Sequence, residues 1–226
     1  MTQWISSIRN VFPIPFVPKG TSYSDEEDKI RSESRNGIIQ AQYVLHKASE
    51  WSASDRVTPE LVLKLQELAV TQIYRCAGYF RDGPVSINEA THQPPDHKEV
   101  GALVAQMCEY LNNNWQAAPV HLAAYTMWRV NWIHPFFGGN GRTARALSYL
   151  LLSAKLGFVI PGTKTIPELI VENRDPYFES LRKADNSWGD GTVDVSAMEE
   201  LMASLLAQQL VIVHQQATGK KDGGVS

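Results

Sequence analysis

The residues best suited to chemistry lie together near the middle of the chain, in the segment HPFFGGNGRTAR from His134 to Arg145. Its glycines, Gly138, Gly139 and Gly141, leave room for a ligand to reach the backbone, and they permit positive φ values. A loop of this kind that runs into a helix aims several backbone N–H groups at an anion, and the helix dipole adds to the attraction. The segment therefore predicts a phosphate-binding loop.

The side chains around the loop suit a polyphosphate and a proton transfer. Arg142 and Arg145 lie three positions apart at the start of the next helix, and their planar guanidinium groups match phosphate oxygens. Asn140 adds a side-chain donor, and the neutral imidazole of His134 can take a proton from an attacking hydroxyl. Taken singly, these features also describe a turn, a packed histidine and a solvated pair of arginines. Together they predict a transferase that moves a phosphate-bearing group onto an alcohol.

The composition narrows the class of protein. The chain has 226 residues, 43% of them hydrophobic and 20% charged, with a formal net charge of −3. This charge argues against a nucleic-acid binder held by bulk electrostatics. We see no apolar run of membrane-spanning length and no signal peptide, so we expect no membrane contact. Cys76 and Cys108 fall in helical patterns and are expected to be buried, reduced thiols of a cytoplasmic protein.

Helical patterns cover most of the chain and predict an all-α fold. Ser24 is expected to cap a first helix with Ile38, Val44 and Leu45 on one face, and Thr58-Pro59 is a typical helix start. The expected helices begin near residue 25 and at 58, 98, 119, 142, 166 and 195, and Gly157 is the expected C-cap of the fifth. The stretch 83–88 instead combines turn residues with alternating polarity, which predicts a short strand or hairpin rather than a helix.

The segment from His134 to Arg145 resembles the signature of the Fic (Fido) family, His-Pro-Phe-x-Asp/Glu-Gly-Asn-Gly-Arg-x-x-Arg. Ala77-Gly78-Tyr79-Phe80-Arg81 is similar to the family's lead into a flap, and Val85-Ser86-Ile87 with Pro94-Pro95 resembles the flap itself. Glu172-Asn173-Arg174 with Tyr177 resembles the helix after the signature. The resemblance extends over roughly residues 31–185.

The resemblance implies a Fic-type helical core with a short β-hairpin flap, and transfer of AMP from ATP to a Ser, Thr or Tyr hydroxyl of a target protein. His134 would be the catalytic base. The nucleotide phosphates would be bound by Gly139, Asn140, Gly141, Arg142 and Arg145, with Arg145 at the γ-phosphate. The target would dock by strand pairing on the flap residues Val85, Ser86, Ile87 and Asn88.

Gly138 departs from the family signature, which has Asp or Glu at this position to help hold Mg²⁺. Glycine has no side-chain ligand, so the usual metal ligand is absent. Lost activity, a metal held by phosphates and water, and a different substrate all remain open. If the missing carboxylate limits turnover, Gly138→Glu should strengthen Mg²⁺-dependent transfer.

Asn36 marks a second departure. The sequence Ser32-Glu33-Ser34-Arg35-Asn36-Gly37 resembles the family's inhibitory motif, Ser/Thr-x-x-x-Glu-Gly/Asn, with Asn36 in the position of the glutamate. In the family that glutamate pairs with the arginine that matches Arg145, so a neutral Asn36 would hydrogen-bond that arginine and inhibit less. A simple helix interruption at Asn36-Gly37 is the alternative.

These observations define an expected organisation and function. We expect an extended arm (1–24), a helical segment with the degenerate inhibitory motif (25–56), a Fic-type catalytic core (57–190), a C-terminal helix (191–217) and a flexible tail (218–226). The expected activity is protein adenylylation, with the target protein and nucleotide as partners and homo-oligomers left open. The alternatives are a nucleotide-binding regulator with weak or lost catalysis and a variant that uses another nucleotide donor.

Overall fold

Helices make up most of the described protein. The computed structural model describes residues 20–87 and 92–219. Within these ranges the helices are α2 (Glu26–Ser49), α3 (Pro59–Val70), the 3₁₀ helix η1 (His97–Glu99), α4 (Val100–Asn113), α5 (Pro119–Ile133), α6 (Asn140–Leu156), α7 (Ile166–Glu172), α8 (Asp175–Gly189) and α9 (Ser196–Thr218). The only β-pairing in the described residues is an isolated bridge between Thr21 and Tyr74. The all-α prediction is confirmed.

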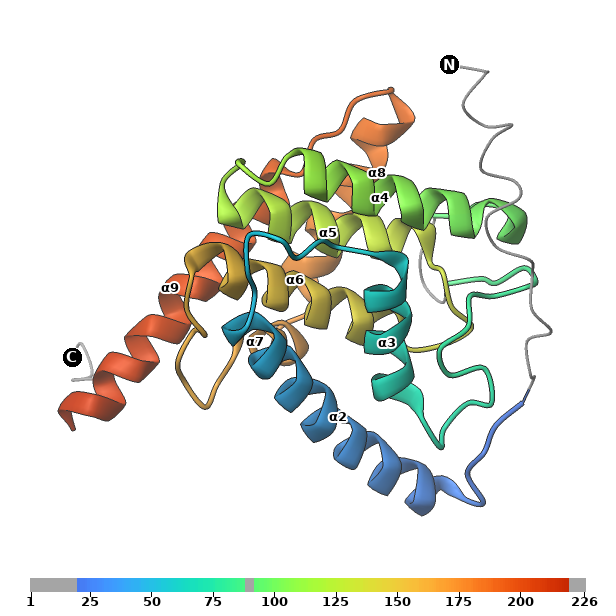
Figure 1. The fold of residues 1–226 in the computed structure, drawn as a ribbon, viewed down its shortest axis with the longest axis horizontal. Coiled ribbons are helices and arrows are strands. Elements are labelled where there is room, and N and C mark those ends of the chain that lie inside the picture. Colours follow the sequence, from blue (N-terminus) through green and yellow to red (C-terminus); the bar gives the residue numbers. More distant parts are fainter. Residues whose placement is uncertain (1–19, 88–91, 220–226) are drawn as a thin grey trace.

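Helices α5 and α6 form the centre of the molecule, with α4 along α5 and with α2 and α3 against α6 (Figure 1). Most residues of both central helices are buried, so the hydrophobic core lies between them and their neighbours. As expected, Gly157 caps the end of α6 in the left-handed conformation, at φ 77°. The start of α6 at Asn140 precedes the expected start by two residues. The connection between α5 and α6 carries the signature segment, and it emerges at one end of this central pair.

The prediction of which face of α2 is buried was wrong for Ile38 and Leu45. Their exposed fractions are 62% and 38%, whereas Val44 is buried. The buried stripe recurs every fourth residue and is largely polar: Ser32, Asn36, Gln40, Val44 and Ala48. Gln40 shows why this is tolerated, since its Nε2 donates to the Leu65 carbonyl of α3 at 2.7 Å. Hydrogen bonds to α3 thus replace part of the usual apolar packing.

The start of α2 and its continuity also differ from expectation. Asp25, rather than Ser24, is the N-cap, because the Asp25 carboxylate accepts a hydrogen bond from the Asp28 backbone N–H at 2.8 Å. The helix continues without a break through Asn36 and Gly37, so this pair does not interrupt it.

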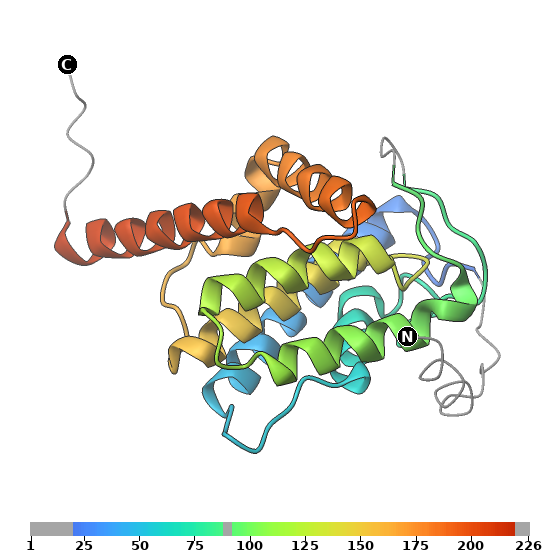
Figure 2. The same ribbon diagram turned by 90° about the horizontal axis from the view of Figure 1, so that it is seen from above.

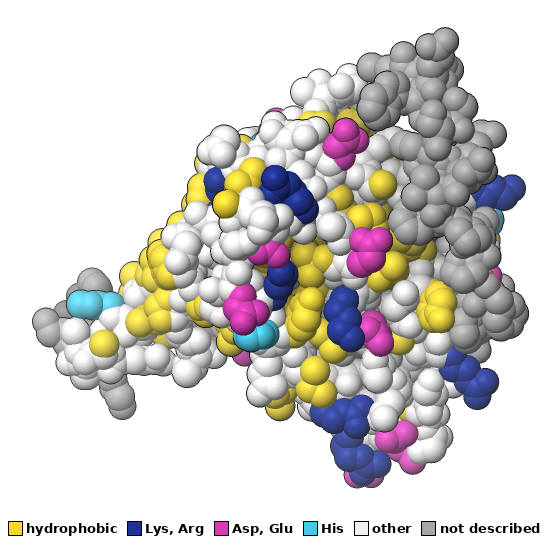
Figure 3. Space-filling view, in the orientation of Figure 1, with side chains coloured by type: hydrophobic (Ala, Val, Ile, Leu, Met, Phe, Trp, Pro, Cys, Tyr) yellow, Lys and Arg dark blue, Asp and Glu magenta, His cyan; other side chains and the backbone are white. Residues whose placement is uncertain are grey.

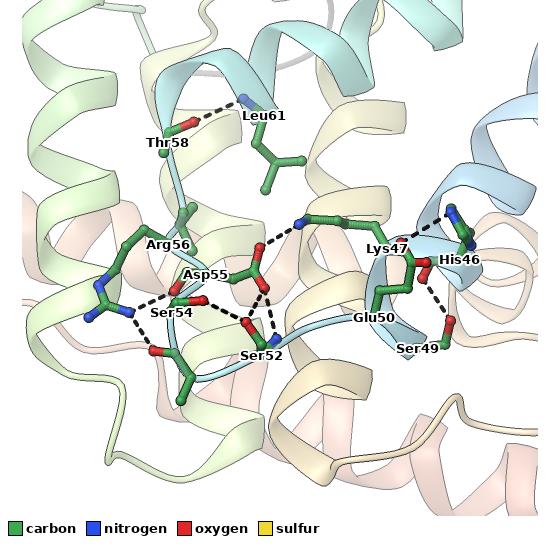
Figure 4. A network of polar contacts seen from close by, with 12 residues as sticks. His46, Lys47, Ser49, Glu50, Ser52, Ser54, Asp55, Arg56, Thr58 and Leu61 are labelled. Carbon is green, nitrogen blue, oxygen red and sulfur yellow. Dashed lines mark hydrogen bonds and ion pairs between the residues drawn. The ribbon is translucent and has the colours of Figure 1, made fainter.

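The link between α2 and α3 is held by a polar network (Figure 4). Lys47 donates to the carboxylate of Asp55 at 2.5 Å, and the Ser52 backbone and hydroxyl donate to the same carboxylate. These contacts lower the pKa of Asp55 to about 2, with the Lys47 hydrogen bond as the largest cause. Thr58 caps α3 by accepting from the Leu61 N–H, as its sequence predicted.

The helical stretch expected beyond residue 166 is divided into α7 and α8. The division falls at Asn173 and Arg174, directly before Asp175-Pro176. Proline disfavours helical conformation in the residue before it and has no N–H to donate, so a new helix begins there.

Helix α9 packs against α5, α7 and α8 through its first half, and its far end extends away from the body (Figure 2). By length and composition it is the one described helix able to cross a membrane, with 22% of its most apolar window buried. The sequence did not lead us to expect such a helix. Its buried side consists of Met198, Met202, Leu205 and Gln209.

Neither described limb of the predicted hairpin, residues 83–87 or 92–96, forms a strand, so the hairpin expectation is not met there. Pro84, Pro94 and Pro95 lack the N–H groups that strand pairing uses. Residues 88–91 lie outside the described residues, as do 1–19 and 220–226, most of the expected arm and tail. The segment boundaries therefore remain predictions.

Candidate active site

His134 occupies a special backbone position at the end of α5. Its φ and ψ are 48° and 59°, in the left-handed region, and its N–H donates to the Val130 carbonyl at 3.0 Å. A residue with a Cβ adopts this conformation at a cost of about 1 kcal/mol, so surrounding contacts must hold it there. The imidazole is thereby positioned before any ligand arrives.

Arg81 supplies those contacts and is itself buried, with an exposed fraction of 3%. Its Nε donates to the His134 carbonyl at 2.8 Å, and its backbone N–H donates to the Pro135 carbonyl at 2.9 Å. The rest of the guanidinium reaches the carbonyls of Gly83 and Pro95, at 3.1 and 2.6 Å. One side chain thus ties the base to both limbs of the predicted flap.

The environment keeps His134 neutral. Burial is the largest of the effects that bring the pKa of His134 down to about 4; the Asn131 backbone offsets part of the shift, and the electrostatic effects of Arg81 and His92 add to it. Its Nδ1 is buried and has no hydrogen-bond partner among the described residues. At neutral pH the imidazole is therefore unprotonated, which is the state a general base needs.

The glycines of the loop allow it to pack closely against α3. Gly139 has a φ of 83°, and a Cβ there would lie 2.6 Å from Cγ1 of Val70, so only glycine fits. Gln66, fully buried on α3, donates to the Gly138 carbonyl at 3.2 Å and accepts from the Gly78 N–H at 2.6 Å. This amide connects the loop to the turn after α3.

Asn140 differs from expectation. Its side chain accepts from the Phe136 N–H at 3.0 Å and donates to the Phe136 carbonyl at 2.8 Å, so it closes the loop on itself. The acceptor oxygen and one amide donor of Asn140 are thus used within the loop. The backbone N–H groups of Asn140, Gly141 and Arg142, at the first turn of α6, have no acceptor among the described residues. These backbone groups could therefore donate to an anion.

Arg145 is the charged group best placed for a ligand. Within the described residues its guanidinium makes no hydrogen bond or ion pair. Burial has the largest effect on its pKa and lowers it; Tyr177 raises the pKa in part, and the nearby charges of Arg174 and Arg142 lower it further. The site thus has an excess of positive charge that a polyphosphate would neutralise.

Two cavities meet at Arg145 and Val171. One, of about 200 Å³, lies between α6 and the α7–α8 junction and has Asn131, Arg174 and Tyr177 among its other lining residues. The other, of about 480 Å³, is lined by residues of α2, α6 and α7. Figure 3 shows hydrophobic side chains lying among charged ones on one face of the molecule. Pockets for drug-sized ligands span about 300–1,000 Å³, so the smaller cavity would hold part of a nucleotide.

The guanidinium of Arg142 contacts residues of both α2 and α3. It donates to the Ala69 carbonyl at 3.0 Å and lies 3.5 Å from the Glu33 carboxylate. Asn36 donates to the carbonyls of Ala69 and Thr71, at 3.4 and 2.7 Å. No hydrogen bond joins Asn36 to Arg145 in the described residues, so the expected contact is not formed; the Asn36 amide nitrogen instead donates to the end of α3.

Gly138 contacts an aromatic ring in place of a metal. A Cβ at this position would lie 2.5 Å from Cε2 of Tyr74 and 3.0 Å from its Cζ. No group of three or more His, Cys, Asp or Glu side chains able to hold a metal occurs in the described residues. A side-chain-held Mg²⁺ does not fit this site, and Gly138→Glu alone would have to displace Tyr74.

The flap residues are partly described. Val85 and Ile87 are half-buried and Ser86 is exposed, an alternation that suits an extended chain, while Asn88 lies outside the described residues. The backbone of residues 85–87 has no hydrogen-bond partner within the described chain. Docking of a target strand on this segment stays a prediction.

The helical core thus brings together a left-handed histidine, a glycine-rich loop and two following arginines. Residues 56–152, a little under half of the chain, match the model of the Fic/DOC family.

Comparison with a relative of known name agrees with this match. The chain is 31% identical over 112 residues to a protein of Drosophila persimilis named protein adenylyltransferase Fic. This match covers 48% of the chain and 20% of that relative, so the chain spans about a fifth of the relative's length.

Two solved structures establish the fold. Fic-1 of Caenorhabditis elegans has a TM-score of 0.66 at 19% identity, over 92% of this chain and 56% of that one. A Fic domain containing signaling protein from Bacteroides thetaiotaomicron has a TM-score of 0.64 at 21% identity, over 88% of this chain and 77% of that one.

Several residues of the site were not assigned to it from the sequence. Arg81 and Arg174 were noticed only as parts of family motifs, and Tyr74 and Gln66 were not noticed at all. The role of such a residue depends on which groups surround it in the folded protein. These residues lie far along the chain from the signature, so their neighbours cannot be read from the sequence around them. The order of residues carries little signal for such contacts.

Proposed function

We propose that this protein transfers a nucleotidyl group, AMP from ATP, to a hydroxyl side chain of a target protein. The observation that carries the proposal is the pairing of a neutral, pre-positioned His134 with unpaired loop amides and the unpaired Arg145. The name of the fly relative, an adenylyltransferase, supports ATP as the donor.

The chemistry follows from this arrangement. The target hydroxyl oxygen attacks the α-phosphorus of ATP, and its proton passes to the imidazole of His134. The new oxygen–phosphorus bond replaces the bond to the β-phosphate, and pyrophosphate leaves with that electron pair. The amides of residues 140–142 and the guanidinium of Arg145 stabilise the negative charge that develops.

The proposal is tested by following covalent labelling. Intact mass is measured after incubation with ATP, and in parallel with UTP, GTP and CTP, while labelled ATP is offered to a cell lysate. We expect an adduct on the chain or on lysate proteins that disappears in His134→Asn, whose side chain tolerates the left-handed backbone. His46→Ala, at an exposed histidine paired with Glu50, is the matched control and should label normally. Labelling that survives in His134→Asn would refute the role of His134.

A second function is favoured by Gly138, which lacks the carboxylate of the signature. In this alternative the protein binds nucleotides as a regulator and has weak or lost catalysis. Calorimetric ATP binding with no covalent adduct under any condition would support it. An adduct of another mass would instead identify a different nucleotide donor.

A further inference from the structure

The phenol of Tyr74 occupies the position where the Fic signature places a carboxylate. A Cβ at Gly138 would meet one edge of the ring, 2.5 Å from Cε2, 3.0 Å from Cζ, the carbon that bears the hydroxyl, and 3.1 Å from Cδ2. The ring therefore fills the space that a side chain at Gly138 would need, and its hydroxyl is bonded to one of the three ring carbons that lie there.

The backbone fixes Tyr74 in this place. Its N–H donates to the Val70 carbonyl at 3.1 Å, and it pairs with Thr21 in the isolated bridge. Ser22 donates to the Ile73 carbonyl at 2.9 Å on one side of that bridge. The Gln66 amide, bonded to both Gly138 and Gly78, joins this turn to the loop. Hydrogen bonds therefore hold both the turn that carries Tyr74 and the loop that carries Gly138.

The charges around the loop fit an anion that brings no side-chain-held cation. The segment from His134 to Arg145 contains no acidic residue. The Glu33 carboxylate lies near the loop, and it is paired with Arg142 at 3.5 Å. Arg145 and Arg174 add positive charge at the adjoining cavity. Magnesium prefers several oxygen ligands in octahedral geometry, which the side chains here do not supply.

We propose that the Tyr74 hydroxyl donates a hydrogen bond directly to the polyphosphate of the donor nucleotide, in place of the carboxylate–metal pair. A carboxylate repels phosphate unless a cation lies between them, whereas a neutral hydroxyl needs none. Nucleotide binding by this protein is therefore largely independent of divalent cations. The proposal rests on the proposed function only in placing a nucleotide at the loop.

The test measures binding rather than turnover. A non-hydrolysable ATP analogue is titrated by calorimetry into the full chain with Mg²⁺ or with EDTA. For the wild type we expect dissociation constants within about threefold of each other. Tyr74→Phe keeps the ring against Gly138 and removes only the hydroxyl, and it should weaken binding about tenfold in EDTA, as expected for one hydrogen bond to a charged group.

A second variant pair tests the exchange itself. Tyr74→Ala together with Gly138→Asp restores the carboxylate and the space for it, and it should bind the analogue at least about tenfold better with Mg²⁺ than with EDTA. Tyr74→Ala alone should not gain this dependence. Thermal unfolding of each variant reports whether it is folded.

The outcomes separate this inference from the proposed function. Equal binding by wild type and Tyr74→Phe, or a wild type that loses binding in EDTA, overturns the role of Tyr74 while leaving transfer intact. Binding that follows the expected pattern, without any covalent labelling, supports Tyr74 and refutes transfer. A folded wild type that binds no analogue under either condition overturns both.

Discussion

The loop between α5 and α6 lies between two groups of site residues, His134 on one side and Arg142 and Arg145 on the other. The surrounding contacts fix these two groups to different degrees. On the base side, the guanidinium of Arg81 holds the carbonyl of His134 from a buried position, and the histidine is fixed in a left-handed conformation. On the phosphate side, Arg142 shares a half-exposed ion pair with Glu33, and Arg145 has no partner within the described residues. The group proposed to accept the proton is thus held in place by the protein, whereas the arginines proposed to bind phosphate have few partners or none within the described residues.

The largest expected effect comes from removing the support of the base side. Arg81→Ala leaves buried carbonyls without donors, so we expect the free energy of unfolding to fall by about 3 kcal/mol. Denaturant titration measures this change. Arg31→Ala, which removes only a surface pair with Glu27, is the matched control and should change stability by less than about 0.5 kcal/mol. Similar small losses in both variants would mean that Arg81 does not hold this side together.

The second prediction concerns acid. The pKa of His134 is about 4 in the folded protein, below the ordinary histidine value of 6.5, so between these values the unfolded chain binds more protons. Stability should therefore fall as the pH falls from 6.5 to 4, by up to about 3 kcal/mol from this group.

Comparison with His134→Asn isolates that contribution, because the other titrating groups are common to both proteins. Unfolding titrations at pH 7 and pH 4.5 should show a smaller acid loss in the variant. A nucleotide bound beside the ring should raise the pKa of His134, which NMR titration can follow. Identical acid losses in the two proteins would contradict a buried neutral imidazole.

The smallest expected effect comes from the phosphate side. Glu33→Gln removes the charge that is paired with Arg142, so the nucleotide analogue should bind about twofold more tightly, and the gain should shrink in high salt. Glu27→Gln, in a similar exposed pair, is the control and should leave binding unchanged. Weaker binding in Glu33→Gln would show that Glu33 orients Arg142 rather than competing for it.

The sequence was a good guide wherever local chemistry decides the structure. The cap at Thr58, the proline at position 59 and the C-cap at Gly157 marked helix ends correctly. The spacing within the signature also placed His134 beside a glycine-rich helix start. These features depend on residues only a few positions apart, so the order of residues carries them.

The sequence was a poor guide wherever distant segments meet. The buried side of α2 is largely polar because Asn36 and Gln40 find carbonyls on α3, and a rule based on apolar periodicity cannot anticipate such partners. The contact of Tyr74 with Gly138 likewise joins positions 64 residues apart.

The left-handed backbone at His134 means that its side chain could be removed without straining the main chain. Glycine adopts positive φ without the steric cost that a Cβ imposes, so His134→Gly relaxes the main chain while it vacates the volume of the ring. Free imidazole in the solvent is small enough to occupy that volume. If His134 acts as the proposed base, added imidazole should therefore restore labelling to His134→Gly, so that a small molecule controls when transfer occurs.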